Sequence, residues 1–313
     1  MALTGAGTFQ PTKKIIIIAG PTAVGKTAVA IEAAKKLNTV ILSADSRQCY
    51  KELNIGVARP SEGELAAVTH YFIASHSIQQ KIDAAFYETY ALELLDMLFA
   101  KHNTVIVTGG TGLYLKALTD GLDNIPEIPE AIRQAIIENY EAGGMNWLQQ
   151  QLQLKDPLFS ATGEMQNPHR MMRALEVMEA TGQSIISFQK GLAAKRNFDI
   201  VQVGLEMPRE QLNERIHKRV DAMMAAGLEN EARQLMPYRH LNALQTVGYK
   251  ELFDYFDGNS TLVQATDLIK QNTRRYAKRQ MTWFKKQKAI NWFNLSQFNN
   301  IETLVHTILD KAG

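Results

Sequence analysis

Cysteine and long apolar runs are both scarce in this sequence. Cys49 is the single cysteine among 313 residues, which excludes an intramolecular disulfide and a zinc site built on cysteines. With no histidine beside it, Cys49 is interpreted as a small buried side chain rather than a nucleophile. The apolar run at residues 15–19 is far shorter than the roughly 20 residues that cross a membrane. We therefore expect a cytoplasmic protein that makes no membrane contact.

The chain also lacks a large excess of charge of either sign. The chain has 34 Lys or Arg against 32 Asp or Glu, a net charge of +2, so total charge does not identify a partner. One local exception lies at residues 268–290, where eight Lys or Arg occur without any Asp or Glu. Apolar residues make up 45% of the chain, which is ordinary for a globular protein with a sizeable core.

Buried strands alternate with helices in the first 120 residues. Apolar runs predict strands at 15–19, 39–43 and 104–108, with helices at 27–37 and 84–99 between them. This order predicts a parallel α/β sheet. After a connection rich in Gly and Pro, only helical periodicity follows, until strand-like runs return at 200–205 and 289–295. We predict an α/β core made of residues 1–122 and 198–313, with an inserted all-helical subdomain at 123–197.

A phosphate-binding motif follows the first predicted strand and opens the first predicted helix. It fits G-x-x-x-x-G-K-[ST] and consists of Gly20, Pro21, Thr22, Ala23, Val24, Gly25, Lys26 and Thr27. Backbone N–H groups and the helix N-terminus bind phosphate oxygens in such a loop, Lys26 adds a full charge, and the Thr27 hydroxyl can ligate Mg²⁺. The core is therefore predicted to be P-loop NTPase-like and to bind a di- or triphosphate.

The carboxylate that an ATPase or GTPase usually places at the end of another core strand is missing from the third strand. That strand runs into Thr108, Gly109, Gly110 and Thr111, whereas Asp45 follows the second strand. Strand C-termini line the ligand crevice of an open α/β sheet, so Asp45, Thr111 and the P-loop are expected to converge. A carboxylate there suits deprotonation of an acceptor, although a turn or cap role for either side chain stays open.

These residues resemble the tRNA dimethylallyltransferase (isopentenyl-tRNA transferase) family, and its bacterial members most closely. The matching segments occur in the expected order at residues 20–27, 43–50, 109–114, 167–170, 173–176, 247–249 and 273–283. Only the P-loop is specific by itself. The ordered occurrence of all of them, over roughly residues 15–290, is what makes the resemblance specific.

The resemblance implies a reaction and roles for several residues. The exocyclic amine of the adenosine 3′ to the anticodon would attack dimethylallyl diphosphate, and pyrophosphate would leave. Asp45 matches the family's general base, Thr111 lies at its reacting centre, and Arg219 matches an arginine that stabilises the pyrophosphate together with Lys26 and Mg²⁺. From the residues alone, Arg219 would sooner belong to a solvated basic face.

The resemblance also assigns positions to the anticodon stem-loop of tRNA, whose target adenine must leave its stack to react. These positions are Asp45, Ser46, Arg47, Gln48, Thr111, Arg133, Gln166, Asn167, Pro168, His169, Arg170, Gln245, Thr246, Val247, Gly248, Tyr249 and Lys250. An exposed helix arginine is an equal alternative for Arg133. His169 replaces the acidic residue more often found there, which leaves open the contact made at that position.

The basic stretch at 268–290 is predicted to be a helix that follows the RNA backbone. Arg274 and Lys278 are assigned to its RNA-facing side, whereas Tyr276 and Trp283 are expected in the core.

Two other classes of function remain open. A small-molecule kinase would use the same loop for ATP and the same aspartate as base, but would need neither the basic stretch nor a long insertion. A non-catalytic P-loop RNA-binding protein would need neither Asp45 nor Thr111. A variant of the tRNA prenyltransferase hypothesis is an enzyme that prenylates a free adenine nucleotide. We expect a monomer.

Overall fold

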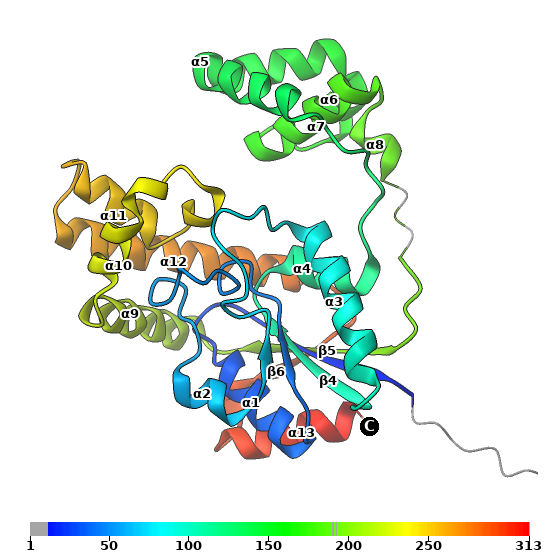
Figure 1. Ribbon diagram of the computed structural model, residues 1–313, viewed down its shortest axis with the longest axis vertical. Helices are drawn as coiled ribbons and strands as arrows, with labels where there is room; N and C mark the ends of the chain where they lie inside the picture. The colour runs from blue at the N-terminus through cyan, green and yellow to red at the C-terminus, as the bar shows by residue number, and fades with distance from the viewer. Residues whose placement is uncertain (1–11, 190, 192, 313) are drawn as a thin grey trace, which may run out of the picture. The chain divides into compact units, whose positions relative to one another are not determined.

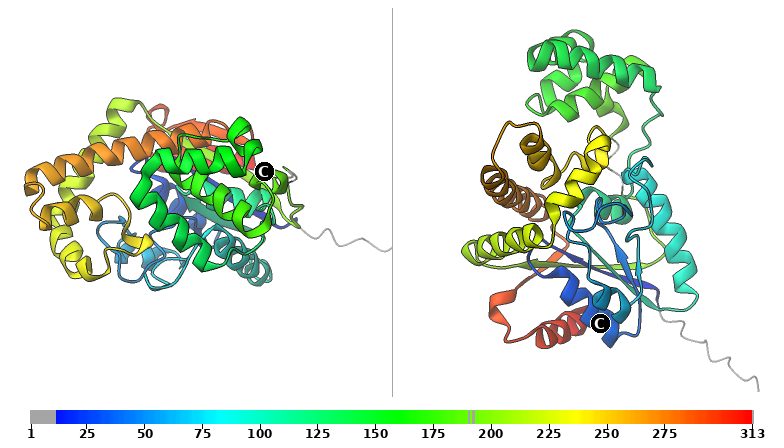
Figure 2. Two further views of the ribbon diagram at one scale, coloured as in Figure 1. Left: turned by 90° about the horizontal axis from the view of Figure 1, so that it is seen from above. Right: turned by 60° about the vertical axis from the view of Figure 1, so that its left-hand side comes forward.

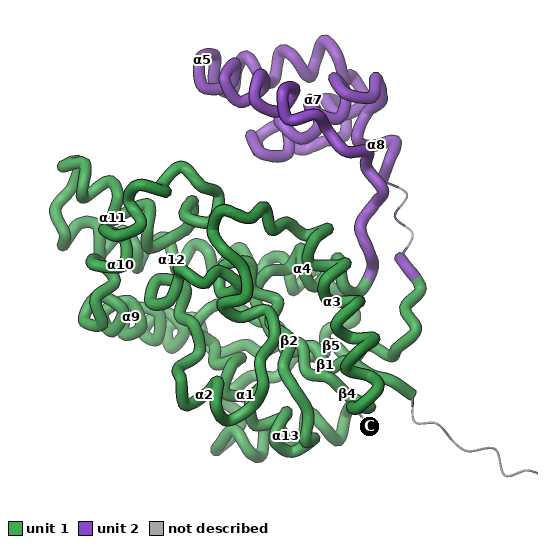
Figure 3. Tube along the Cα trace, in the orientation of Figure 1, with its two compact units in different colours: residues 1–119, 195–313 green, residues 120–194 purple. Residues whose placement is uncertain are grey.

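The computed structural model describes residues 12–189, 191 and 193–312, and the chain divides into two compact units (Figure 3). One unit contains the residues up to Thr119 and from Lys195 onward, and the other is Asp120–Ala194. The boundaries predicted from the sequence, after residues 122 and 197, each fall three residues later than those at 119 and 194.

Six parallel strands form the sheet of the first unit, in the order β3-β2-β4-β1-β5-β6 (Figure 1). Their bounds are β1 Lys14–Ala19, β2 Ile41–Ser43, β3 His70–Tyr71, β4 Thr104–Gly109, β5 Asp199–Glu206 and β6 Ile290–Asn294. The central strand β1 is apolar on both faces because helices cover both sides of the sheet. The predicted parallel α/β core is therefore confirmed. Sequence reasoning missed only β3, whose two residues are too few to form an apolar run.

The helices of the first unit include two groups whose members pack against one another (Figure 2). Their bounds are α1 Lys26–Lys36, α2 Glu62–Ala67, α3 Ala84–Phe99, α4 Gly112–Asp120, α9 Arg209–Ala225, α10 Leu228–Leu235, α11 Tyr249–Phe256, α12 Leu262–Phe284 and α13 Ile301–Ala312. Helices α1 and α13 pack together, and α9 to α12 pack in sequence order with α12 also against α9. Ile16 and Ile18 of β1 meet Ile216 of α9 and Ile308 of α13 in one core cluster.

Among its described residues, the second unit has helices and connecting loops but no strand. It consists of α5 Glu130–Lys155, α6 Pro157–Thr162, α7 Pro168–Thr181 and α8 Ile185–Phe188. Leu148 and Leu152 of α5 pack against Met171 and Leu175 of α7, which gives this unit a hydrophobic core of its own. Helix α5 bends at Gly144, whose φ of 62° lies in the left-handed region.

Across the described ranges, every helix is too short or too polar to span a lipid bilayer.

Candidate active site

The predicted phosphate loop lies between β1 and α1. Gly20 and Gly25 have φ values of 151° and 110°, and a Cβ on Gly20 would lie only 2.7 Å from the Leu205 carbonyl oxygen. Both positions therefore require glycine. The loop lines a cavity of about 500 Å³ that also contains Lys26 and Thr27. The predicted loop and helix N-terminus thus face one cavity.

Lys26 is the cation of this cavity most affected by its surroundings. Burial lowers its pKa to about 8, the Asp45 carboxylate partly opposes that shift, and the Arg219 guanidinium lowers the pKa further. The Lys26 ammonium donates to the Pro21 carbonyl oxygen at 2.8 Å. Lys26 is consequently close to losing its charge in the mildly alkaline range.

This pKa predicts that pyrophosphate binding weakens as pH rises above about 8. The charged ammonium attracts the anion, so above its pKa each pH unit raises Kd up to about tenfold until the bound form also titrates. Calorimetry with inorganic pyrophosphate between pH 6.5 and 9.5 measures the effect. The control is Lys26→Met. Ionisation of pyrophosphate affects the wild type and this variant equally, so the difference between their curves reports on Lys26. A wild-type curve parallel to that of the variant would refute the assignment.

Asp45 and Thr111 belong to two neighbouring turns that are bonded to each other. Asp45 Oδ1 accepts from the backbone N–H groups of Arg47 at 2.9 Å and Gln48 at 3.2 Å. Thr111 Oγ1 accepts from the Ser46 N–H at 3.0 Å, and the Thr111 N–H donates to the Ala44 carbonyl at 3.2 Å. Asp45 therefore does have the turn role that the sequence left open. The two turn hydrogen bonds hold its carboxylate in the lining of the phosphate-loop cavity.

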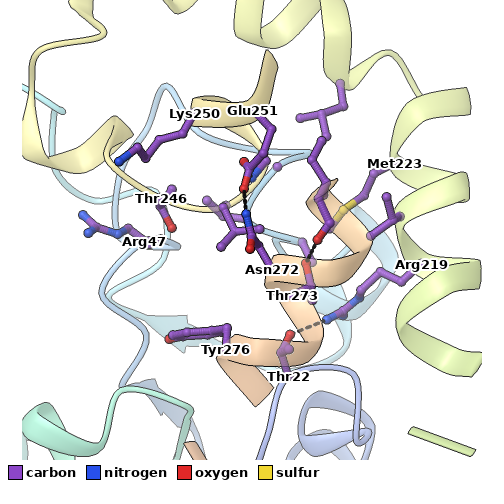
Figure 4. A pocket seen from close by; sticks show the side chains of 18 of the residues that line it. Thr22, Arg47, Arg219, Met223, Thr246, Lys250, Glu251, Asn272, Thr273 and Tyr276 are labelled. Atoms are coloured by element: carbon purple, nitrogen blue, oxygen red, sulfur yellow. Dashed lines mark hydrogen bonds between the residues drawn. The ribbon is translucent and has the colours of Figure 1, made fainter. Parts of the chain in front are cut away.

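Arg219 and Arg215 turn from α9 toward the phosphate loop. Arg219 Nη1 donates to Thr22 Oγ1 at 3.3 Å (Figure 4), and Arg215 Nη1 donates to the Val24 carbonyl at 3.0 Å. Burial lowers the pKa of Arg219, and Asp45 opposes that shift. The alternative of a solvated basic face is therefore wrong for Arg219, which is partly buried, whereas Arg215 is exposed.

A second cavity, of about 540 Å³, meets the first one at Asp45. Both cavities are lined by Thr22, Asp45, Val57, Ala58, Arg219 and Tyr276. The second cavity also contains most of the positions predicted to contact RNA in this unit, namely Ser46, Arg47, Gln245, Thr246, Val247, Gly248 and Lys250. A group held by the phosphate loop and a group entering from the second cavity would meet at Asp45.

Tyr249 does not line either cavity. It is fully buried, and its hydroxyl donates to Glu231 Oε1 at 2.6 Å. The same carboxylate accepts from the backbone N–H groups of Ile55 and Gly56 at 2.8 and 2.9 Å. Tyr249 thus supports the loop that ends in Val57 and Ala58 rather than offering its side chain to a ligand.

Helix α12 presents a different face to the cavity than the sequence predicted. Asn272, Thr273, Tyr276 and Arg279 line the second cavity, and Tyr276 is 36% exposed. The prediction that Tyr276 lies in the core is wrong. The buried stripe of α12 is instead Ala265, Ile269, Ala277, Gln280 and Phe284, so the ring of Tyr276 falls beside it. This spacing of three and four residues is the signal that could have located the cavity face.

Arg274 and Lys278 lie outside the lining of both cavities. Arg274 Nη1 contacts His217 Nε2 on α9, and Lys278 is exposed. Trp283 is half-buried, with its indole against Gly112.

In the second unit, Arg133 forms an ion pair rather than standing free. Its Nε lies 3.2 Å from Glu176 Oε1, and Arg173 Nη1 lies 3.1 Å from Glu176 Oε2. Glu176 is buried, so it depends on these partners for its charge. This pair joins α5 to α7 within the unit.

The remaining predicted RNA contacts of the second unit cluster at the start of α7. Asn167 Oδ1 accepts from the Arg170 N–H at 3.3 Å and caps the helix, with Pro168 in its first turn. Arg170 pairs with Glu164, whereas Gln166 and His169 are exposed.

Comparison with known proteins identifies the family. Residues 48–287 match the family model described as IPP transferase. The chain belongs to the IPP transferase family. It is 45% identical to the tRNA dimethylallyltransferase of Cytophaga hutchinsonii over 96% of this chain and 98% of that protein. It is 46% identical to the tRNA dimethylallyltransferase of Christiangramia forsetii, with coverages of 94% and 99%. These matches confirm the resemblance seen in the sequence.

Solved structures agree with that assignment. The tRNA isopentenylpyrophosphate transferase of Bacillus halodurans is 34% identical, with a TM-score of 0.71 and 96% of each chain covered. A eukaryotic dimethylallyltransferase acting on tRNA has a TM-score of 0.78, covering 96% of this chain and 79% of its own. Because the sequence identity is only 24%, this second match supports the fold of the IPP transferase and nothing more.

Proposed function

We propose that this IPP transferase moves a dimethylallyl group from dimethylallyl diphosphate to the exocyclic amine of the adenosine 3′-adjacent to the anticodon in tRNA, and releases pyrophosphate. The observation that carries the proposal is the meeting of two cavities at Asp45, one of them lined by a phosphate loop. The names of the relatives from Cytophaga hutchinsonii and Christiangramia forsetii supply the acceptor class.

In this reaction the new N–C bond forms as the C–O bond to the diphosphate breaks. Backbone N–H groups of the phosphate loop, Lys26 and Arg219 hold the diphosphate and receive its growing negative charge. The amine enters from the second cavity and gives a proton to the Asp45 carboxylate. Thr111 keeps the turn that carries Asp45 in place through the Ser46 N–H. The bonding electrons leave with the pyrophosphate.

Magnesium fits the oxygen donors of the phosphate-loop cavity. Among the described residues, no group of three His, Cys, Asp or Glu could hold a metal ion. Mg²⁺, however, keeps several waters and binds through one or two protein oxygens together with substrate phosphates. The Thr27 hydroxyl and the Asp45 and Glu64 carboxylates line this cavity, and we propose that Thr27 holds the ion. Bound Mg²⁺ would neutralise charge on the leaving pyrophosphate.

The second cavity would receive the flipped adenine of the anticodon stem-loop. Its volume of about 540 Å³ suits one nucleoside, and Arg47, Lys250 and Arg279 add positive charge to its lining. Taking a base out of its stack costs a few kcal/mol, and contacts with the adjacent phosphates can offset that cost. The chain would act as a monomer, because both cavities lie within one unit.

The deciding experiment mixes the protein with Mg²⁺, labelled dimethylallyl diphosphate and one acceptor at a time: tRNA, AMP or ATP. Label in tRNA alone supports the proposal. Label in AMP or ATP would instead make the chain an adenine-nucleotide prenyltransferase. ATP consumption with phosphorylation of a metabolite would make it a kinase.

The two faces of α12 allow a paired prediction on RNA binding. Arg279→Ala is expected to weaken anticodon stem-loop affinity about tenfold and to reduce the salt slope by about one, because one phosphate contact is lost. The Arg274→Ala and Lys278→Ala double variant tests the face predicted from the sequence. Fluorescence anisotropy between 50 and 200 mM salt measures both. An unchanged slope removes the corresponding face from the RNA interface.

A further inference from the structure

We propose that Gln280 is a positioning residue that sets the gap between the phosphate loop and the turns carrying Thr111 and Asp45. The inference rests on the proposed function, since it concerns the distance between a donor on one side and an acceptor on the other. No step of the reaction described above uses Gln280.

The carboxamide of Gln280 is buried and bonded at both ends. Its Oε1 accepts from the Thr22 backbone N–H at 2.8 Å, and its Nε2 donates to the Gly110 carbonyl oxygen at 2.8 Å. Gln280 is 7% exposed. Thr22 belongs to the phosphate loop and Gly110 directly precedes Thr111. One side chain from a third element, α12, therefore joins the two loops that must hold the two reactants.

The loop that Gln280 meets on the acceptor side is itself firmly connected to Asp45. The Thr111 N–H donates to the Ala44 carbonyl, Thr111 Oγ1 accepts from the Ser46 N–H, and a Cβ on Gly109 would collide with Ala44. The Thr111 turn and the Asp45 turn thus move as one body. On the donor side, Thr22 also accepts from Arg219. Gln280 consequently spaces a donor body from an acceptor body.

Gly110 leaves the room that this arrangement needs. A Cβ there would collide with Gln280 Nε2 and would lie 3.7 Å from the Gly20 carbonyl oxygen. The φ of Gly110 is not positive, so its backbone would accept alanine. The amide of Gln280 therefore occupies the space beside Gly110. A side chain at position 110 would displace that amide, and the change would come from the loop rather than from α12.

The expected signature of a positioning residue is a loss of rate without a matching loss of binding. Each body would keep its own contacts without Gln280, so pyrophosphate and the stem-loop should still bind. Their separation would no longer be fixed, and a misplacement of about 1 Å can cost about 100-fold in rate. A residue needed only for folding would lower affinity, rate and thermal stability together.

The test compares Gln280→Met, which keeps the side-chain length and removes both hydrogen bonds, with wild type. Prenyl transfer to an anticodon stem-loop is expected to lose about 10- to 100-fold in kcat, with Kd for inorganic pyrophosphate changed less than about threefold. The matched control is Gln271→Met, because Gln271 is exposed on the same helix. The control is expected to keep kcat, Kd and Tm.

Gly110→Ala supplies a second route that leaves Gln280 itself in the chain. It is expected to reproduce the loss of kcat at nearly unchanged pyrophosphate affinity, and it decides the question if Gln280→Met does not fold. An active wild type with kcat within about threefold in both variants overturns this inference alone. Equal losses in kcat, pyrophosphate affinity and Tm also overturn it, in favour of a folding role. A wild type that leaves the stem-loop unlabelled overturns the proposed function, and this inference with it.

Discussion

Asp45→Asn is expected to lower kcat for prenyl transfer about 10³-fold while stem-loop affinity stays nearly constant, because a positioned general base contributes about 10²- to 10⁴-fold. The asparagine Oδ1 can still accept from the N–H groups of Arg47 and Gln48, which Asp45 Oδ1 does now. The turn is thereby retained and only the proton acceptor is lost. Single-turnover transfer and fluorescence anisotropy measure the two quantities.

The pH of that experiment matters because Asp45 also acts on Lys26. The Asp45 carboxylate raises the pKa of Lys26 against the effect of burial, so Asp45→Asn lowers that pKa below about 8. Assays near or below neutral pH and with saturating donor reduce the contribution of this loss of charge. Asp83→Asn is the matched control, since Asp83 caps α3 by accepting from the Phe86 N–H at 2.9 Å. Equal losses of rate and RNA affinity in Asp45→Asn would make Asp45 a structural residue.

The sequence was sufficient where the chemistry is local. The phosphate loop was predictable because its glycines, Lys26 and Thr27 are contiguous and stand between a strand and a helix. Asp45 was predictable by topology, since it follows a core strand and parallel strands end at one edge of the sheet. Both inferences need only the order of elements along the chain.

Side-chain direction on the long helices was not predictable in the same way. The basic character of α12 was evident, but packing against α9 turns Arg274 toward His217 and leaves Tyr276 and Arg279 at the cavity. For α9, only the tertiary structure shows that Arg219 faces Thr22. The loop at residues 56–60 was not singled out from the sequence, and its start is held by Glu231, far along the chain, which accepts from the N–H groups of Ile55 and Gly56.

Arg219→Gln is expected to lower kcat about 10²- to 10³-fold, the loss typical of removing one preorganised donor from a developing negative charge. Arg219 is partly buried and lines both cavities beside Thr22, so its charge acts through little water. Inorganic pyrophosphate affinity should fall less than kcat, because the charge on the leaving group is largest as the C–O bond breaks. Arg219 lowers the pKa of Lys26, so its removal leaves Lys26 more fully charged. Deprotonation of Lys26 therefore cannot explain the loss.

Lys218, on the same helix as Arg219, provides a control that distinguishes the effect of Arg219's position from the effect of its charge. Lys218 also lines the phosphate-loop cavity, but its side chain is 75% exposed and pairs with Glu214 at 2.6 Å. Water screens such a charge, so Lys218→Gln is expected to change kcat less than about threefold. Steady-state transfer to the anticodon stem-loop, with both variants at pH 7, measures the contrast. Similar losses in the two variants would mean that net positive charge, and not the contact of Arg219 with Thr22, stabilises the departing pyrophosphate.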